Sequence, residues 1–170
     1  MLTDQQVELL KTVRKNIASE QIGYDQSIWI KNRMQMDGWV DVFCGITVGD
    51  LGIVLAAPDC GTTCCFAGHI TYAACKADPS LLRTYDANTI NGMALELFPV
   101  PYRSMLANAF HHNFGRRQFL KHGETQNEFA KSNVLGVLDL MIAGVDPVEI
   151  DNKLDYAGFY PEFEHLLPTE

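Results

Sequence analysis

Three of the five cysteines in this chain lie within six residues, next to a histidine that follows shortly after. A cysteine at the N-terminus of a helix has a lowered thiol pKa, because the unpaired backbone N–H groups there stabilise the thiolate. A base nearby completes the arrangement that nucleophilic catalysis needs. If the protein is an enzyme, Cys60 or Cys64 is therefore the candidate nucleophile. The candidate base is His69, with His111 and His112 as alternatives.

The same segment offers a second chemistry, metal binding. Cys65 and His69 are four residues apart, so on a helix they share one face and could chelate one ion, with Cys60 or Cys64 as a third ligand. A structural zinc site needs four ligands, and no second Cys/His pair has standard spacing. A redox pair of Cys60 and Cys64 lacks a Cys-x-x-Cys motif. We therefore expect no metal and no other cofactor, and the candidate ligands, if there are any, are Cys65 and His69.

Close packing is the interpretation that we favour for this segment. The residues from Cys60 to Ala77 are mostly small or apolar, and Asp78-Pro79 stops the run. A helix that is apolar nearly all round is usually buried, and a buried cysteine behaves as a small hydrophobe. Four small residues fall on one face of the expected helix: Cys64, Gly68, Thr71 and Cys75.

The segment also carries a resemblance. Its string Cys60-Gly61-Thr62-x-x-Cys65-x-Ala67-Gly68-His69, with Met36 and Trp39 upstream, resembles a block in small uncharacterised proteins of bacteriophages and bacteria. The similarity covers about ten residues closely and about half of the chain loosely. That family has no settled activity. The resemblance implies kinship and a phage-type or bacterial context, and it implies no particular reaction.

A basic and aromatic stretch gives the better functional lead. No acidic residue occurs between Glu96 and Glu124, although the whole chain has a net charge of −8. Aromatic faces beside Arg or Lys suit a stacked base and a phosphate, and adjacent arginines suit a phosphate or carboxylate. The candidate ligand-binding residues of this stretch are Arg103, His111, His112, Arg116, Arg117 and Lys121.

Packing competes with binding for this stretch too. Tyr102, Met105, Leu106 and Phe110 have helical spacing and suit a core, and the arginines could pair with acidic residues elsewhere. We weigh three functions. The preferred one is a non-catalytic binding or inhibitory protein that engages an anionic, nucleotide-like small molecule or a host protein. The alternatives are a thiol-dependent enzyme and a structural or assembly protein, and a homo-oligomer fits the last.

The composition bounds these hypotheses. Apolar residues make up 47% of the 170 residues and charged residues 20%, which is typical of a folded globular protein and suits a single domain spanning 1–170. The negative charge makes nucleic acid an unlikely partner. No stretch approaches the roughly 20 apolar residues that span a bilayer, and no signal peptide is recognisable. We expect a cytoplasmic protein with free thiols and no membrane contact.

The expected fold is mainly α, a single compact helical domain with a small β-hairpin element. Thr3 and Gln6 form a capping box before the first helix, and Thr125 and Glu128 form another before the last long one. Gly144 is placed as a C-terminal cap, after which Asp146-Pro147 starts a short helix. We expect further helices near residues 24–31, 60–77, 88–98 and 102–111, and the hairpin near residues 39–57.

Overall fold

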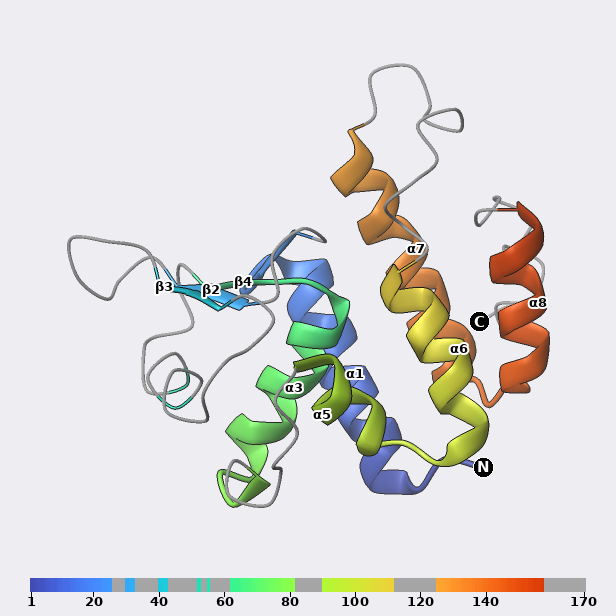
Figure 1. Ribbon diagram of the computed structural model, residues 1–170, viewed down its shortest axis with the longest axis horizontal. Coiled ribbons are helices and arrows are strands. Elements are labelled where there is room, and N and C mark those ends of the chain that lie inside the picture. Colours follow the sequence, from blue (N-terminus) through green and yellow to red (C-terminus); the bar gives the residue numbers. More distant parts are fainter. Residues whose placement is uncertain are drawn as a thin grey trace.

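A computed structural model shows a mainly helical protein with a small mixed sheet (Figure 1). It describes residues 1–25, 30–32, 40–42, 52, 55, 62–81, 90–111 and 125–157. The helices are α1 (Asp4–Ser19), α3 (Phe66–Ala77), α5 (Ile90–Glu96), α6 (Val100–His111), α7 (Gln126–Ile142) and α8 (Pro147–Ala157). The strands are β1 (Gly23–Tyr24), β2 (Ile30–Asn32), β3 (Val40–Val42) and β4 (Thr62–Cys64). The predicted fold class is confirmed. Among the described residues, no helix is long and apolar enough to cross a membrane.

Local capping signals fix the helix ends that were expected. The Thr3 hydroxyl accepts from the Gln6 backbone N–H at 3.3 Å, and the Gln6 side chain accepts from the Thr3 N–H at 2.9 Å. Thr125 and Glu128 make the same reciprocal pair before α7. At the start of α8 the Asp146 carboxylate accepts from the Val148 N–H at 2.8 Å. These side chains satisfy backbone donors that a helix leaves unpaired in its first turn.

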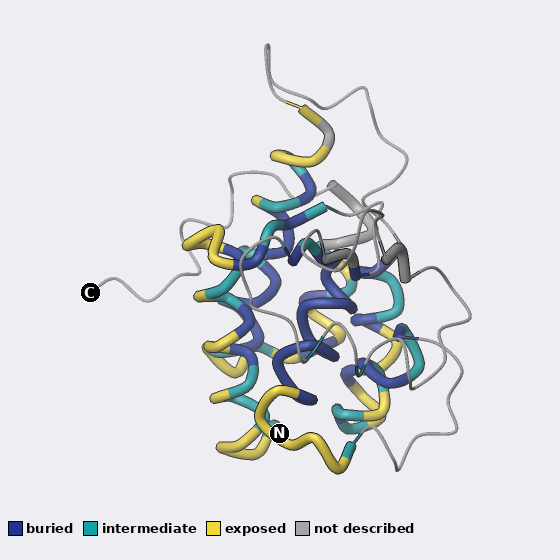
Figure 2. The backbone as a smooth tube through the Cα atoms, turned by 90° about the vertical axis from the view of Figure 1, so that its left-hand side faces the viewer, coloured by how far each residue is buried: buried dark blue, intermediate teal, exposed yellow. Residues whose placement is uncertain are grey.

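Helix α3 is buried, as the packing interpretation predicted. Every residue from Phe66 to Cys75 is buried. Helices α1 and α5 pack against it, α7 covers α1 from the other side, and α6 pairs with α8. In Figure 1 the sheet lies to the left of α1, α3 and α5, and α6, α7 and α8 lie to their right. Figure 2 shows the buried parts of the helices turned towards each other and the exposed parts turned outwards.

Two of the expected helices differ from the structure. The segment expected to be helical near 24–31 supplies strands β1 and β2 instead, because their backbone groups pair with β4 on both of its edges. The helix expected from Cys60 begins only at Phe66, since residues 62–64 form β4. Cys64 is therefore a strand residue and does not share a helical face with Cys75. Tertiary pairing overrides local propensity in both places.

The β element differs in its pairing. Strand β3 falls inside the span expected to form a hairpin, but its antiparallel partner is β2, with Ile30 opposite Val42 and Asn32 opposite Val40. The sheet order is β1-β4-β2-β3, with β1 parallel and β2 antiparallel to β4. Of the span expected to form the hairpin, residues 39, 43–51, 53–54 and 56–57 lie outside the described residues.

Helix α7 ends in a Schellman motif that depends on a left-handed glycine. Gly144 has a φ of 76°, its N–H donates to the Met141 carbonyl at 3.1 Å, and the Val145 N–H donates to the Leu140 carbonyl at 3.0 Å. A Cβ on Gly144 would meet nothing within 4 Å, so a side chain there is opposed by the backbone conformation alone.

Gly144→Ala is therefore expected to lower the free energy of unfolding by about 1 kcal/mol, the usual cost of a left-handed L-residue. Urea denaturation followed by circular dichroism measures it. Gly144→Asn is the matched control, because asparagine adopts this conformation more readily and should lose clearly less. Equal losses for the two variants would contradict this explanation.

Candidate functional site

The junction between strand β4 and helix α3 brings the sequence-predicted thiols and imidazole together. Cys65 follows β4 directly and is the N-cap of α3, with extended backbone angles. Its sulfur accepts from the Gly68 backbone N–H, with an N–S distance of 3.4 Å. Cysteine thus performs the capping role that serine, threonine or aspartate usually performs. Among the described cysteines, Cys65 is the one at a helix N-terminus.

The other two described cysteines lie in apolar surroundings. Burial raises the thiol pKa of Cys64 well above its usual range, and the nearby charge of Cys65 raises it further. Burial also raises the pKa of Cys75 to about 11, with a smaller contribution from Asp78. Both side chains are consequently protonated at neutral pH, which opposes a nucleophilic role. Cys60, the other candidate nucleophile, lies outside the described residues.

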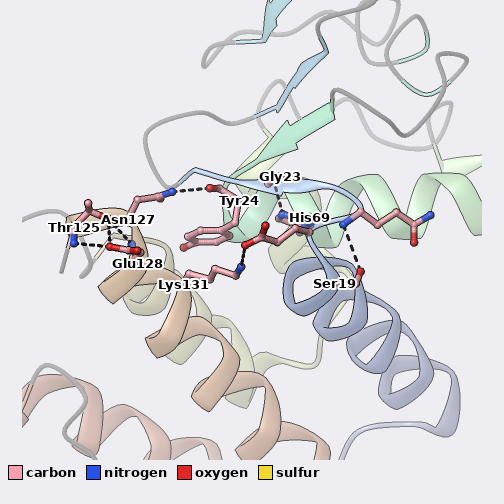
Figure 3. A network of polar contacts seen from close by, with 10 residues as sticks. Ser19, Gly23, Tyr24, His69, Thr125, Asn127, Glu128 and Lys131 are labelled. Atoms are coloured by element: carbon pink, nitrogen blue, oxygen red, sulfur yellow. Dashed lines mark hydrogen bonds and ion pairs between the residues drawn. The ribbon is translucent and has the colours of Figure 1, made fainter. Parts of the chain in front are cut away.

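His69 is held from the side by strand β1. Its Nε2 lies 3.1 Å from the carbonyl oxygen of Gly23, so the ring donates from Nε2 (Figure 3). The ring of Tyr24 stacks on the imidazole, with centroids 6.0 Å apart and planes 19° from parallel. Burial lowers the pKa of His69 to about 4, which the hydrogen bond to Gly23 only partly offsets. The imidazole is therefore neutral at physiological pH, and its second nitrogen, Nδ1, carries a lone pair.

Strand β1, which contacts the His69 ring through Gly23 and Tyr24, is itself held in place from two sides. A Cβ on Gly23 would lie 2.7 Å from the Thr63 hydroxyl oxygen, so only glycine lets β1 approach β4 this closely. The Asn127 side chain of α7 donates to the Tyr24 carbonyl at 2.7 Å (Figure 3). Burial raises the pKa of the Tyr24 hydroxyl well above its usual range, and the nearby Cys65 and Asp25 raise it further. Helices α3 and α7 are thus connected through two residues of β1.

The predicted anion-binding surface falls mostly outside the described residues. His112, Arg116, Arg117 and Lys121 are not described, and His111 is the last residue of α6. Arg103 is exposed on α6, and its Nε donates to the Phe98 carbonyl at 3.0 Å. This contact joins Arg103 to the link between α5 and α6. It leaves the remaining guanidinium donors for other partners.

A second basic surface was missed by the sequence reasoning. A shallow groove with a volume of about 600 Å³ runs between α1 and α7. Three cations, one carboxylate and three small or apolar residues line it: Lys11, Arg14, Lys15, Asp139, Ala18, Ser19 and Ile142. On α1 the lining residues recur at helical spacing, beside the buried face of Leu10, Val13 and Ile17. That spacing was the signal that could have found the groove.

The three cations of the groove differ in whether they form an ion pair. Arg14 makes two hydrogen bonds to the carboxylate of Asp139, one of them 2.9 Å long from its Nη2, and these bonds raise the pKa of Arg14. Lys11 pairs with Glu8 at 2.7 Å, where both side chains are largely exposed. Lys15 is exposed and makes no ion pair with any residue that the structure describes. The groove therefore presents more positive than negative charge on a protein of net charge −8.

Comparison with protein families, with curated proteins and with solved structures finds no match to this chain. The resemblance to small phage and bacterial proteins therefore stays a hypothesis. Within the described ranges, no group of three or more His, Cys, Asp or Glu side chains is arranged to hold a metal ion.

The buried neutral His69 predicts a loss of stability in mild acid. The unfolded imidazole takes up a proton near pH 6.5, whereas the folded one does so only near pH 4. Between these values the unfolded state binds more protons, so the free energy of unfolding falls as the pH falls, by roughly 3 kcal/mol in total. Urea denaturation from pH 7 to 4.5, with a chelator present so that only protons compete for the imidazole, measures this slope.

His69→Gln is the control for the acid effect, because an amide can still donate to the Gly23 carbonyl but does not titrate. It should flatten the slope in this range. The exposed carboxylates with lowered pKa values, such as Glu128 and Asp78, act mainly near and below their unfolded pKa values of 4.5 and 3.8, at the acidic end of this range. An unchanged slope in His69→Gln would assign the effect to another group.

The packing of Cys64 and Cys75 predicts slow alkylation. With iodoacetamide at neutral pH, both thiols should react far more slowly in the folded protein than in urea, because they are buried and protonated. Peptide mass spectrometry of the timed reaction measures each site separately. Fast labelling of either residue before unfolding would contradict the packing interpretation.

Proposed function

We propose that this protein is a non-catalytic binding protein that engages an anionic partner through the groove between α1 and α7. The observation that supports this is the lining of the groove, which contains three cations, Lys11, Arg14 and Lys15, and one carboxylate, that of Asp139. A surface of this sign on an acidic protein draws anions to one place, because the rest of the surface repels them.

The neighbouring residues narrow the kind of anion. Ammonium groups on flexible stems bind carboxylates and phosphates without strict geometry, whereas the Arg14 guanidinium is already occupied on one side by Asp139. Ile142 and Ala18 add apolar surface between the charges. A partner with acidic groups next to an apolar or aromatic body suits this lining, such as a nucleotide or an acidic protein segment.

The basic stretch at residues 103–122 belongs to the same proposal as a second contact surface. Its candidate residues, with Arg116 and Arg117 foremost, carry the charge and hydrogen-bond donors that phosphate or carboxylate recognition uses. The suspected resemblance to small phage and bacterial proteins, itself a hypothesis, motivates our proposal of an inhibitory role towards a host factor. The groove and the basic stretch are separately testable, because their cations lie in different parts of the sequence.

Reversal of one groove charge tests the proposal. ATP and a polyglutamate peptide serve as probes of the two partner classes, with binding measured by calorimetry at low and at physiological salt. Lys15→Glu is expected to lower the affinity for the probe that binds roughly three- to tenfold, because reversing an exposed charge costs about 0.7–1.4 kcal/mol of binding free energy. Added salt should weaken binding as well.

Lys153→Glu is the matched control, since it makes the same charge change on α8, where Lys153 pairs with Glu149 at 2.9 Å. It should leave binding within about twofold, in keeping with the small effect of a distant surface charge. Arg116→Glu reports the contribution of the basic stretch. Equal effects of Lys15→Glu and Lys153→Glu, or no binding of either probe to the unmodified protein, would refute the groove as the binding site.

A further inference from the structure

The groove between α1 and α7 follows one face of α1 over two helical turns. The lining residues of α1 run from Lys11 to Ser19 in the i, i+3, i+4, i+7, i+8 pattern of a helix face, and all except Arg14 are exposed. At 1.5 Å per residue this side of the groove is about 12 Å long. Asp139 and Ile142 of α7 form the other side. A groove of this length between two helices has room for two turns of a third.

The two sides of the groove run in opposite directions. Arg14 pairs with Asp139, whereas Glu20, further along α1, pairs with Lys131, further back on α7 (Figure 3). The lining reaches the last residue of each helix, so α1 ends at one end of the groove and α7 at the other. The carbonyl groups at the C-terminus of a helix carry partial negative charge. Both ends of the groove therefore oppose a compact polyphosphate.

The lining also lacks the groups that hold a nucleotide. None of the described lining residues is aromatic, so a base finds no ring on which to stack. None of them belongs to the first turn of α1 or α7, where backbone N–H groups would be free to bind a phosphate. The groove instead offers the apolar side chains of Ala18 and Ile142. These features favour an acidic protein segment over a nucleotide.

Two lysines of the groove match the spacing of acidic residues on a helix. Lys11 and Lys15 are four positions apart, about 6 Å along the axis of α1, and two carboxylates at positions i and i+4 of another helix have the same separation. Lys15 makes no ion pair with any described residue, and the pair of Lys11 with Glu8 is largely exposed. An exposed pair of this kind is weak, so a carboxylate of a partner can replace Glu8.

We propose that the groove binds an acidic amphipathic helix of a partner protein. This inference rests on the proposed function and specifies the class of partner. Carboxylates at i and i+4 of the bound helix pair with Lys11 and Lys15, and its aliphatic side chains cover Ala18 and Ile142. Arg14 stays bonded to a carboxylate of α7 and joins the two sides of the groove, so it shapes the site while the lysines supply the charge.

Two fluorescent peptides of identical composition test the inference on the full chain. In the first peptide Glu and Leu are placed on neighbouring faces of a helix, and in the second they alternate, so that no apolar helix face forms. Fluorescence anisotropy should show that the first peptide binds at least about tenfold more tightly. The reason is that only the first can present carboxylates and aliphatic side chains to the groove together. Its circular dichroism should also become more helical on binding.

A neutral substitution tests the shape of the site. Ala18 is exposed, and Ala18→Gln places a long side chain in the groove without changing the charge. It should lower the affinity for the first peptide roughly tenfold. Thr12→Gln is the matched control, because Thr12 is exposed on the same helix and does not line the groove. It should bind the peptide as the unmodified protein does, and circular dichroism checks that both variants are folded.

The outcomes separate this inference from the proposed function. If the two peptides bind equally, or ATP binds more tightly than the first peptide, and Lys15→Glu weakens that binding, the groove remains an anion site but the helical partner is wrong. Equal affinities of Ala18→Gln and Thr12→Gln for the first peptide would also overturn the inference. If neither peptide nor ATP binds in a way that depends on Lys15, the proposed function fails together with it.

Discussion

The burial of helix α3 on all sides is the constraint on which the rest of this fold depends. A helix with an exposed face needs neighbours on one side only, but α3 has buried residues from Phe66 to Cys75 without interruption. Helices α1 and α5 cover two of its sides, and β4 precedes it directly. The small residues Ala67, Gly68, Ala73 and Ala74 allow these neighbours to approach closely, and Phe66 packs edge-on against Phe110 of α6.

Because α3 is buried, the hydrogen bonds of its Thr71 and His69 side chains are made inside the protein. The Thr71 hydroxyl donates to the Ile90 carbonyl at the start of α5, at 3.1 Å. His69 reaches the Gly23 carbonyl in β1. Each bond is directional, so together they fix how α5 and β1 lie against α3, which apolar contacts alone would define less sharply. The polar residues of the central helix thus help to select one packing arrangement.

The sequence predicted the parts of the fold that depend on neighbouring residues. Both capping boxes, the left-handed Gly144 and the stop at Asp78-Pro79 could be recognised, because each acts within one helical turn. Strands β1 and β4 could not, since β1 has two residues and β4 three, and their pairing joins segments far apart in the chain. Short strands carry too few residues for an alternating pattern to appear.

The candidate sites, too, could be predicted from the sequence only in part. Cys65 and His69 were predicted to share one face of a helix, whereas Cys65 is the N-cap that precedes α3. This capping role was not predicted, because cysteine is not among the residues that usually cap. The groove was missed because Lys11, Arg14 and Lys15 follow Asp4 and Glu8 on α1 and share the helix with its apolar core residues. Such a helix looks like an ordinary amphipathic one until α7 is placed beside it.

The strand order has a consequence for how the chain is made. Strand β4 lies between β1 and β2, so β1 has no strand partner until residues 62–64 have left the ribosome. Helix α1 and the β2–β3 pair can form earlier from their own residues, but β1 cannot, and the central helix follows β4 in the chain. The hydrophobic face of α1 must therefore wait for α3. A newly made N-terminal segment of this protein is a natural client for chaperones that shield apolar surface during synthesis.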